Sequence, residues 1–234
     1  VSITVDKDNE VYDSREDCNA IIDTVKNELI RGCQTTVIPS SVTSIGYRAF
    51  ADIRGLERME LPAGLKTIDS AAFEGCCSLQ SIMIPDGVTS IGNEAFYYCS
   101  SLTSVVIGEG VTTIDSKAFM GCTALKNITL PDSVTHIGEN AFRNCTGLSS
   151  VKLSSNLESL PEYLFWACSS LTSITIPTSV TSIADNVFAF CDNLESITFE
   201  GTVEQWNAIS FSKYWNGGLK ITEITCSSTS RVVP

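Results

Sequence analysis

Apolar positions along the chain recur with a period of 23 residues. In Leu79–Ile84 the pattern is L-x-x-I-x-I, and its last four residues alternate as expected for a strand with one buried face. Pro85 ends this segment because proline lacks the amide hydrogen for a further ladder bond. Val88–Ile91 alternates again and is predicted to be a second short strand. A fixed repeat of this length predicts a solenoid, in which each unit buries its apolar side chains against its neighbours.

Three side chains mark each repeat: a phenylalanine, a cysteine three residues later and a leucine three residues after that. The segment Asn93–Tyr98, between the second strand and the cysteine, is predicted to be a helical turn or short helix with its phenylalanine pointing inward. Stacked units would then align like residues in interior columns. The columns are Phe50, Phe73, Phe96, Phe119, Phe142, Phe165 and Phe188; Cys76, Cys99, Cys122, Cys145, Cys168 and Cys191; and Leu56, Leu79, Leu102, Leu125, Leu148, Leu171 and Leu194.

The pattern therefore predicts an α/β solenoid of about eight 23-residue coils, each with a strand, a corner, a short strand and a helical turn. Residues 1–35 do not fit the repeat, and we expect them to form an N-terminal cap. This cap would contain a strand at Val1–Val5 and a hairpin made by Ala20–Thr24 and Glu28–Arg31. A cap is needed because an open end would expose the core and an unpaired strand edge.

The regular array is predicted to span residues 36–199 and to be followed by a degenerate last repeat and C-terminal cap at 200–226. Residues 227–234 are small and polar, and we interpret them as a tail or linker. In the C-terminal cap, Val203, Trp206 and Phe211 fall on the valine, isoleucine and phenylalanine columns. Trp206 and Trp215 are large enough to cover the open end. Ile221, Ile224 and Cys226 can resume the first-strand pattern after a slip of four residues.

The ten cysteines do not follow the pattern of a disulfide-built domain. Six of them occupy one column whose first member is Ile53, so we expect buried free thiols. Bridges between neighbouring coils remain an alternative, although they would pair only part of a continuous column. Cys18 and Cys33 flank the predicted hairpin, and a disulfide between them is a second open alternative.

The formal net charge is −12, from 27 acidic and 15 basic residues. Such a chain repels phosphate backbones and anionic lipid headgroups, so nucleic acid and membrane surfaces are unfavourable partners. The sequence contains no apolar run of about 18 residues, and no membrane insertion is expected. At Val1 the sequence begins with a strand-like run in place of a signal peptide. This indicates a trimmed start or a piece of a longer protein.

The repeat LxxIxIPxxVTxIGxxAFxxC resembles that of the BspA-like (Treponema pallidum-type) leucine-rich repeat proteins of bacterial surfaces. The clearest matches are VTSIGYRAF at 42–50 and VTSIGNEAF at 88–96, and the flanking segments 12–21 and 201–209 also resemble this family. The resemblance implies a right-handed solenoid in a secreted or cell-wall-attached protein of a host-associated bacterium. It also implies a link to adhesion, to host matrix proteins or to other cells, and it carries over no catalytic motif.

Candidate chemistry is sparse. The single histidine, His136, is predicted to lie on the surface of the second strand, and the cysteines do not form the paired groups that bind zinc. Asp86, Glu109 and Asp132 should form a column at the corner after the first strand. Two of these carboxylates could share Ca²⁺, or they could simply be solvated corner acids. We expect no catalytic residue, no cofactor and no metal.

The candidate binding residues are Tyr97, Met120, Arg143 and Trp166, which follow the repeat phenylalanine in four consecutive coils. These residue types are enriched in the centres of protein interfaces. One hypothesis is that they form a strip that contacts a partner. The alternative is that the side chains lie on the turns and help to pack them. A flat, hydroxyl-rich sheet face formed by the first strands is a second candidate surface.

These observations favour a monomeric, non-enzymatic interaction or adhesion module that is secreted or displayed on a bacterial cell. Its ligand would be a protein or glycan of the host or of neighbouring cells. The alternative is a structural spacer within a larger surface protein, because stacked coils about 4.8 Å apart form a rod.

Overall fold

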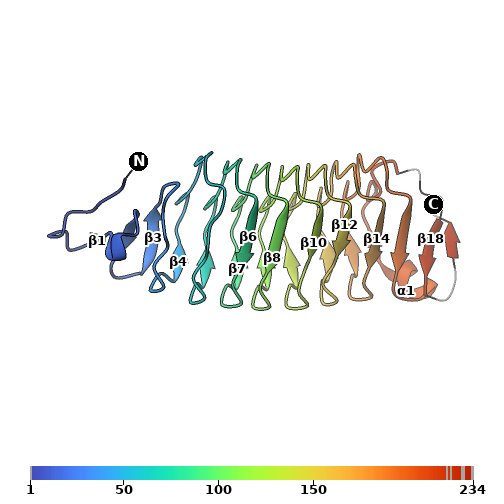
Figure 1. Ribbon diagram of the computed structural model, residues 1–234. Coiled ribbons are helices and arrows are strands. Elements are labelled where there is room, and N and C mark those ends of the chain that lie inside the picture. The colour runs from blue at the N-terminus through green and yellow to red at the C-terminus, as the bar shows by residue number, and fades with distance from the viewer. Residues whose placement is uncertain (1, 220, 222, 228–229, 233–234) are drawn as a thin grey trace.

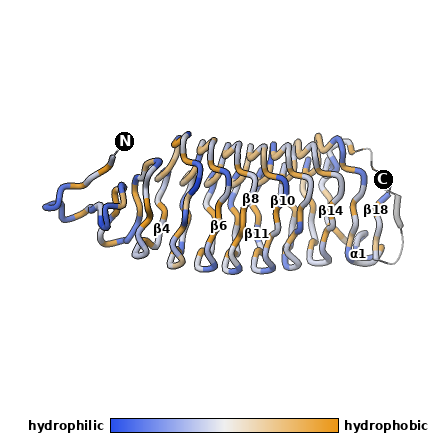
Figure 2. The backbone as a smooth tube through the Cα atoms, in the orientation of Figure 1, coloured by the Kyte–Doolittle hydropathy of each residue, from blue (hydrophilic) through white to orange (hydrophobic). Residues whose placement is uncertain are grey.

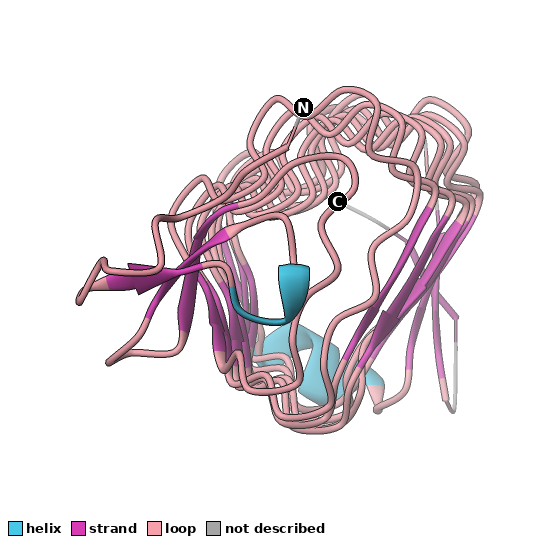
Figure 3. Cartoon of the chain, turned by 60° about the vertical axis from the view of Figure 1, so that its left-hand side comes forward, coloured by secondary structure: helices cyan, strands magenta, loops and turns pink. Residues whose placement is uncertain are grey.

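The computed structural model describes residues 2–219, 221, 223–227 and 230–232. The chain winds into a rod of stacked coils, with its two ends at opposite ends of the rod (Figure 1). Viewed towards the N-terminal end, the coils have strands on two sides and loops on the other two (Figure 3). Hydrophobic residues recur at the same places in successive coils (Figure 2). The architecture is a solenoid of stacked coils, as the 23-residue period predicts.

The second strands of the repeat form parallel ladders in which each isoleucine or leucine faces its counterpart one coil away. Ile45, Ile68 and Ile91 are partners in this register, and all are buried. The strands are β4 (Ser44–Ile45), β5 (Thr67–Ile68), β7 (Ser90–Ile91), β9 (Thr113–Ile114), β11 (His136–Ile137), β13 (Ser159–Leu160), β15 (Ser182–Ile183) and β17 (Ser210–Phe211).

The first strands alternate exposed and buried residues, as the L-x-x-I-x-I pattern predicts. They pair in parallel as β6–β8, β10–β12 and β14–β16–β18, and β19 is added antiparallel to β18. Their bounds are β6 (Ser81–Ile84), β8 (Ser104–Ile107), β10 (Asn127–Thr129), β12 (Ser150–Lys152), β14 (Ser173–Ile176), β16 (Ser196–Phe199), β18 (Glu223–Cys226) and β19 (Ser230–Val232).

The repeat phenylalanines form a single file through the core. All seven are fully buried, and neighbouring rings stack with centroids 5.1–6.0 Å apart and planes within 11° of parallel. The spacing grows from 5.1 Å between Phe50 and Phe73 to 6.0 Å between Phe165 and Phe188. This stack confirms the predicted column, and each ring is covered on both faces only when a coil lies on either side.

The six column cysteines are free, buried thiols, as expected. Each Sγ donates a hydrogen bond to the carbonyl oxygen of the repeat phenylalanine in the preceding coil, at 3.1–3.3 Å. That oxygen already accepts an amide within its own coil, so the thiol occupies its second lone pair. Ile53 begins the column because no phenylalanine coil precedes it. Cys18 is also a free buried thiol, so the alternative disulfide to Cys33 is not formed.

The predicted helical turn is wrong. In the segment 92–99, Glu94 and Tyr98 have left-handed backbone conformations, with φ of 58° and 55°. The amides of Glu94, Phe96 and Tyr98 donate to carbonyls of the next coil, at 2.8–3.0 Å, while the amides between them close turns within the coil. A helix would use every amide inside its own coil. Among the described residues α1 (Val203–Ala208) is the only α-helix, so the class is a β-solenoid and the expected α/β assignment is corrected.

The N-terminal segment forms an antiparallel hairpin, as predicted, of β2 (Ile21–Asp23) and β3 (Glu28–Arg31). β1 (Tyr12–Asp13) pairs with β2 and is followed by a short 3₁₀ helix, η1 (Arg15–Asp17). On the other side of the hairpin, β3 pairs in parallel with β4 of the first coil. The expected strand at Val1–Val5 is not present in residues 2–5, and Val1 lies outside the described residues.

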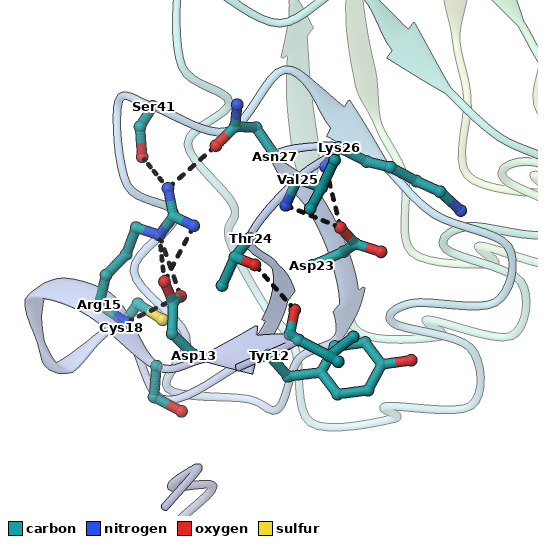
Figure 4. Close-up of polar contacts among 12 residues, drawn as sticks. Tyr12, Asp13, Arg15, Cys18, Asp23, Thr24, Val25, Lys26, Asn27 and Ser41 are labelled. Carbon is teal, nitrogen blue, oxygen red and sulfur yellow. Dashed lines mark hydrogen bonds and ion pairs between the residues drawn. The ribbon is translucent and has the colours of Figure 1, made fainter. Parts of the chain in front are cut away.

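Side chains fasten this hairpin to the first coil. Arg15 forms an ion pair with Asp13 at 2.9 Å, and its Nη1 donates to Asn27 Oδ1 at 3.0 Å and to Ser41 Oγ at 3.4 Å (Figure 4). The Asp23 carboxylate accepts the amides of the turn that follows it, which fixes the hairpin connection.

The division of the chain at residues 35, 199 and 226 remains a prediction.

At the other end, α1 begins with a capping box between Thr202 and Gln205. Trp206 lies on this helix and packs against Phe199, Phe211 and Trp215 with ring centroids 5.0–6.0 Å away. These contacts bury both tryptophans in one aromatic cluster.

At this end the structure corrects the predicted columns of Trp206 and Phe211 and confirms the register of the last strand. Phe211 pairs with Ile183 and therefore occupies the isoleucine column of the second strand, while the predicted isoleucine position, Trp206, lies on the helix. Ile224 pairs with Ile197, which confirms the four-residue slip. Within the segment expected to be a tail, residues 230–232 form β19, and residues 228–229 and 233–234 lie outside the described residues.

Replacement of Phe119 by alanine should lower the free energy of unfolding by about 3–5 kcal/mol, because it leaves a cavity between two stacked rings. Phe119 lies 5.2 Å from Phe96 and 5.5 Å from Phe142, so neither neighbour can fill the space without leaving its own stack. Denaturant unfolding measures the change, with Thr129→Ala on the exposed face of β10 as a control that stays close to wild type. A midpoint equal to that of wild type would contradict the stacked core.

Stability should fall above pH 9 because of the buried thiols. Burial raises the pKa of Cys145 from its ordinary 9.0 to about 12. The unfolded chain therefore releases this proton first, and the stabilisation that is complete below pH 9 is lost progressively as the pH rises towards 12. Between pH 8 and 10 Cys145→Ala should lose about 1 kcal/mol less than wild type. Denaturant titrations at both pH values measure this difference, and parallel losses would refute the assignment.

Candidate interaction surface

The four candidate residues lie in neighbouring coils on the loop side that carries the left-handed turns, which we call the turn face. Their carbonyls accept backbone amides from the preceding coil, and each of these hydrogen bonds is 2.8 Å long. The donor–acceptor pairs are Gly75 to Tyr97, Tyr98 to Met120, Gly121 to Arg143 and Asn144 to Trp166. This ladder places the side chains in one column, which we call the ridge: Tyr97, Met120, Arg143 and Trp166.

Each ridge side chain is half-buried. The Tyr97 ring packs edge-on against Tyr98, with centroids 4.5 Å apart, and burial together with the neighbouring Tyr98 and Glu94 raises the pKa of Tyr97. Tyr98 lies across the bare Cα of Gly121, where a Cβ atom would approach the ring to 2.8 Å. The ridge residues therefore pack the turns and also present part of their surface to solvent.

Arg143 is the most constrained member of the ridge. Its guanidinium carbon lies 4.3 Å from the centroid of the Trp166 ring and 5.5 Å from that of Tyr163. Nη1 donates to Asn140 Oδ1 at 3.2 Å, whereas the buried Nε has no hydrogen-bond partner among the residues that the structure describes. A planar guanidinium stacked on an aromatic ring gains a cation–π attraction, so these contacts hold Arg143 flat along the turn face.

Other cations on this face bind carboxylates of a neighbouring coil. Lys117 Nζ lies 2.9 Å from Glu94 Oε1, and this hydrogen bond raises the pKa of Lys117. Arg48 pairs with Glu74 of the next coil and with Asp52 of its own. These exposed or half-exposed pairs contribute little to stability individually, but they align adjacent turns.

Two aromatic residues were not in the predicted set. Tyr163 contacts Arg143 from the next coil, and Phe190 packs against Trp166 with centroids 4.9 Å apart. Tyr163 and Phe190 occupy left-handed positions of their turns, with φ of 58° and 60°. The sequence predicts only that Phe190 lies in the column next to the ridge. Its contact with Trp166 depends on this backbone conformation and could not be predicted from the repeat.

The sheet face of the first strands contains a small apolar area. Met83 and Val106 face each other across β6 and β8 and are 66% and 50% exposed. Beside them is an open hollow of about 520 Å³ lined by residues including Met59 and Leu61. Here the chain makes a single bridge from Arg58 to Ser81 in place of a full strand. Farther along the rod the equivalent outward residues are Thr129, Lys152, Thr175 and Thr198.

The sequence matches the family profile described as BspA type Leucine rich repeat region (6 copies), over residues 26–122 and 89–216. These ranges cover most of the chain. The chain belongs to the BspA-type leucine-rich repeat family. A comparison with curated proteins found no significant match.

Solved structures of leucine-rich repeat proteins share the fold. A protein from Eubacterium ventriosum is 26% identical with a TM-score of 0.75, and the match covers 81% of this chain and 52% of that protein. The Treponema pallidum leucine-rich repeat protein is 27% identical with a TM-score of 0.67, covering 85% of this chain and 92% of the other. A Bacteroides ovatus protein, 24% identical with a TM-score of 0.64, covers 97% and 71%. The chain thus spans about half the length of the first of these proteins.

In this leucine-rich repeat protein the corner acids bind backbone amides. Asp86 Oδ1 accepts the amide of Glu109 at 3.0 Å, and Asp132 Oδ1 accepts that of Ser155 at 2.9 Å. The second hydrogen bond lowers the pKa of Asp132. Each carboxylate thus bonds a corner to the next coil.

The structure also places the histidine and the other side chains that could ligate a metal. Over the described ranges, no group of three metal-ligating side chains comes together. His136 is exposed on β11. No helix in the described part of the chain is long and apolar enough to cross a membrane.

Arg143→Ala should expose one face of Trp166 and lower the free energy of unfolding by about 0.5–1 kcal/mol. Arg143→Lys should restore only part of this loss, because an ammonium group cannot stack as a plane. Acrylamide quenching of tryptophan fluorescence reports the exposure, since Trp206 and Trp215 are buried at 3% and 8% exposure. The control is Lys126→Ala, at an exposed position beside β10 on the sheet face. Equal quenching in all variants would contradict the stacking of Arg143 on Trp166.

Proposed function

We propose that this chain is a non-enzymatic interaction module of a secreted or cell-surface bacterial protein, and that it binds a macromolecular ligand through the ridge. Repeat solenoids of this class present extended surfaces and commonly act as protein-binding scaffolds. Membership of the BspA-type family supports an interaction role. Adhesion to host matrix or to neighbouring cells is the specific form of that role that we propose.

One observation carries the proposal: Tyr97, Met120, Arg143 and Trp166 form an unbroken column over four coils, in a face whose backbone hydrogen bonds are already used between coils. A ligand on this face would therefore be recognised by side chains. Tyr, Trp and Arg are the residue types that supply most binding energy at interface centres, and Met is enriched there. Tyr97 and Trp166 are also large and rigid, so they lose little conformational entropy when a partner covers them.

The proposed ligand is a protein or a glycan. Aromatic rings can stack on the apolar face of a sugar or on an apolar side chain of a protein, and the ridge offers both rings and a guanidinium. The net charge of −12 makes nucleic acid an unfavourable ligand.

The structural spacer remains a second candidate, and the half-burial of the ridge favours it. Side chains that pack the turns need no partner to explain their size, and Arg143 is already held by Trp166 and Asn140. The two functions differ in what truncation of the ridge does. A spacer would lose some stability, whereas an interaction module would also lose its ligand.

The test is to immobilise the chain and probe it with purified host extracellular matrix proteins, bacterial surface extracts and a glycan array. For any ligand retained, the variant Tyr97→Ala/Met120→Ala/Trp166→Ala should weaken binding about 30-fold or more, as expected for the loss of a hot spot. The matched control is Met83→Ala/Val106→Ala on the sheet face, which should change affinity less than about twofold.

Circular dichroism at the assay temperature verifies that both variants are folded. Full retention of every ligand by the ridge variant would remove the ridge as the binding surface. Absence of any ridge-dependent ligand across the set would favour the spacer.

A further inference from the structure

A second feature of the turn face lies at its C-terminal end, next to Trp166. The structure has a hollow of about 280 Å³ there, between the turn of the last regular coil and the segment that follows α1. Its lining includes Phe190, Asp192, Leu194, Gly217, Gly218 and Leu219. This volume lies below the range of about 300–1,000 Å³ typical of sites for drug-sized molecules. The hollow is therefore suited to a single side chain of a larger partner.

Phe190 forms an open wall of this hollow. Its ring touches Trp166, with centroids 4.9 Å apart, yet the residue is 61% exposed. Its φ is 60°, in the left-handed region, where the equivalent positions of two other coils carry Gly75 and Gly121. A side chain at this φ costs free energy, and the exposed ring recovers little of it by packing. Asp52, Asn144 and Ala167 occupy the same position in other coils, so the fold itself requires no ring there.

Another part of the lining is backbone, at Gly217 and Gly218. Gly217 and Gly218 have φ of 57° and 85°, and a Cβ atom on Gly217 would lie only 2.4 Å from the Cα of Ala189. The glycine loop therefore lies directly against the turn that carries Phe190. Around Gly218 an added Cβ would meet nothing within 4 Å, so this part of the loop faces open space.

The charge of the hollow selects the occupant. Asp192 is exposed, and its carboxylate takes part in no ion pair within the part of the chain that the structure describes. Two coils before Phe190, the same face already holds a guanidinium, that of Arg143, 4.3 Å from the centroid of the Trp166 ring. An aromatic wall beside an unpaired carboxylate is complementary to a flat cation, which can stack on the ring and donate to the acid.

The geometry points to an arginine-anchor pocket: the hollow bounded by Phe190, Asp192 and the Gly217–Gly218 loop receives an arginine side chain of a protein partner. The guanidinium stacks on Phe190 and pairs with Asp192. This inference rests on the proposed interaction function and names the partner as a protein with an exposed arginine. Lysine fits less well because its ammonium group cannot stack as a plane.

The test is an NMR titration of the ¹⁵N-labelled chain with the blocked tripeptide acetyl-Gly-Arg-Gly-amide, compared with the tripeptides that carry Lys, Gln and Glu in the middle. The Arg peptide should shift the amides of residues 190–194 and 217–219 in a saturable way. The Lys peptide should bind more weakly, and the Gln and Glu peptides should leave these amides unshifted. Asp192→Asn and Phe190→Ala should each weaken binding of the Arg peptide about two- to fivefold.

Two control variants make the result specific. Asp8→Asn removes the same charge at the far end of the rod, and Tyr98→Ala removes an exposed ring from the same column of turns, so both should bind the Arg peptide as wild type does. Absence of shifts at 20 mM Arg peptide, equal shifts with the Gln peptide, or equal weakening by Asp8→Asn would each overturn the pocket.

The outcome is separable from that of the ridge. Loss of a ligand in the ridge variant without any binding of the Arg peptide would overturn the pocket and leave the interaction function standing. Binding of the Arg peptide in the absence of any ridge-dependent ligand would support the pocket and overturn the ridge as the binding surface.

Discussion

The structure depends on the hydrogen bonds that each turn makes to the next coil. In the segment after the second strand, every other amide leaves its own coil, because two residues of each coil from Phe50 to Phe188 adopt left-handed conformations. As a result, one amide donates to a carbonyl of the next coil and the following amide donates to a carbonyl of its own turn. It fixes the spacing at which the phenylalanines stack, and it gives every coil the same cross-section.

The cysteine column is a consequence of the same constraint. The phenylalanine carbonyl accepts an amide within its turn and has a second lone pair directed towards the next coil. A thiol is small enough for this buried position and can donate to that lone pair, which an alanine or valine cannot do. Burial also raises the pKa of these thiols, so they remain protonated donors at neutral pH. Their role is therefore to satisfy the backbone between coils.

Function is left to the positions that the stacking does not specify. Because the backbone of the turn face is bonded from coil to coil, side chains can vary there without changing the fold, and this is where Tyr97, Arg143, Trp166 and Phe190 occur. The ridge and the arginine-anchor pocket lie on the same face and share the Trp166–Phe190 contact. A partner that covered both would bury a continuous surface from the coil of Tyr97 to the C-terminal end of the array. The interaction role and this pocket are our proposals for how the face is used.

The period of the sequence by itself determined the solenoid, the single file of phenylalanines, the buried thiols and the alignment of the ridge, because one residue in every 23 must meet its counterpart when identical units stack. It did not determine the turns. Arg48, Ala71, Glu94 and Lys117 share a left-handed position although their residue types give no sign of it, and the coil-to-coil hydrogen bonds impose that conformation. Tertiary structure also decided that Phe211 enters an isoleucine column and that Arg143 lies on Trp166. Contacts of this kind join side chains whose direction is set by the backbone, and a repeating pattern of letters records only their order.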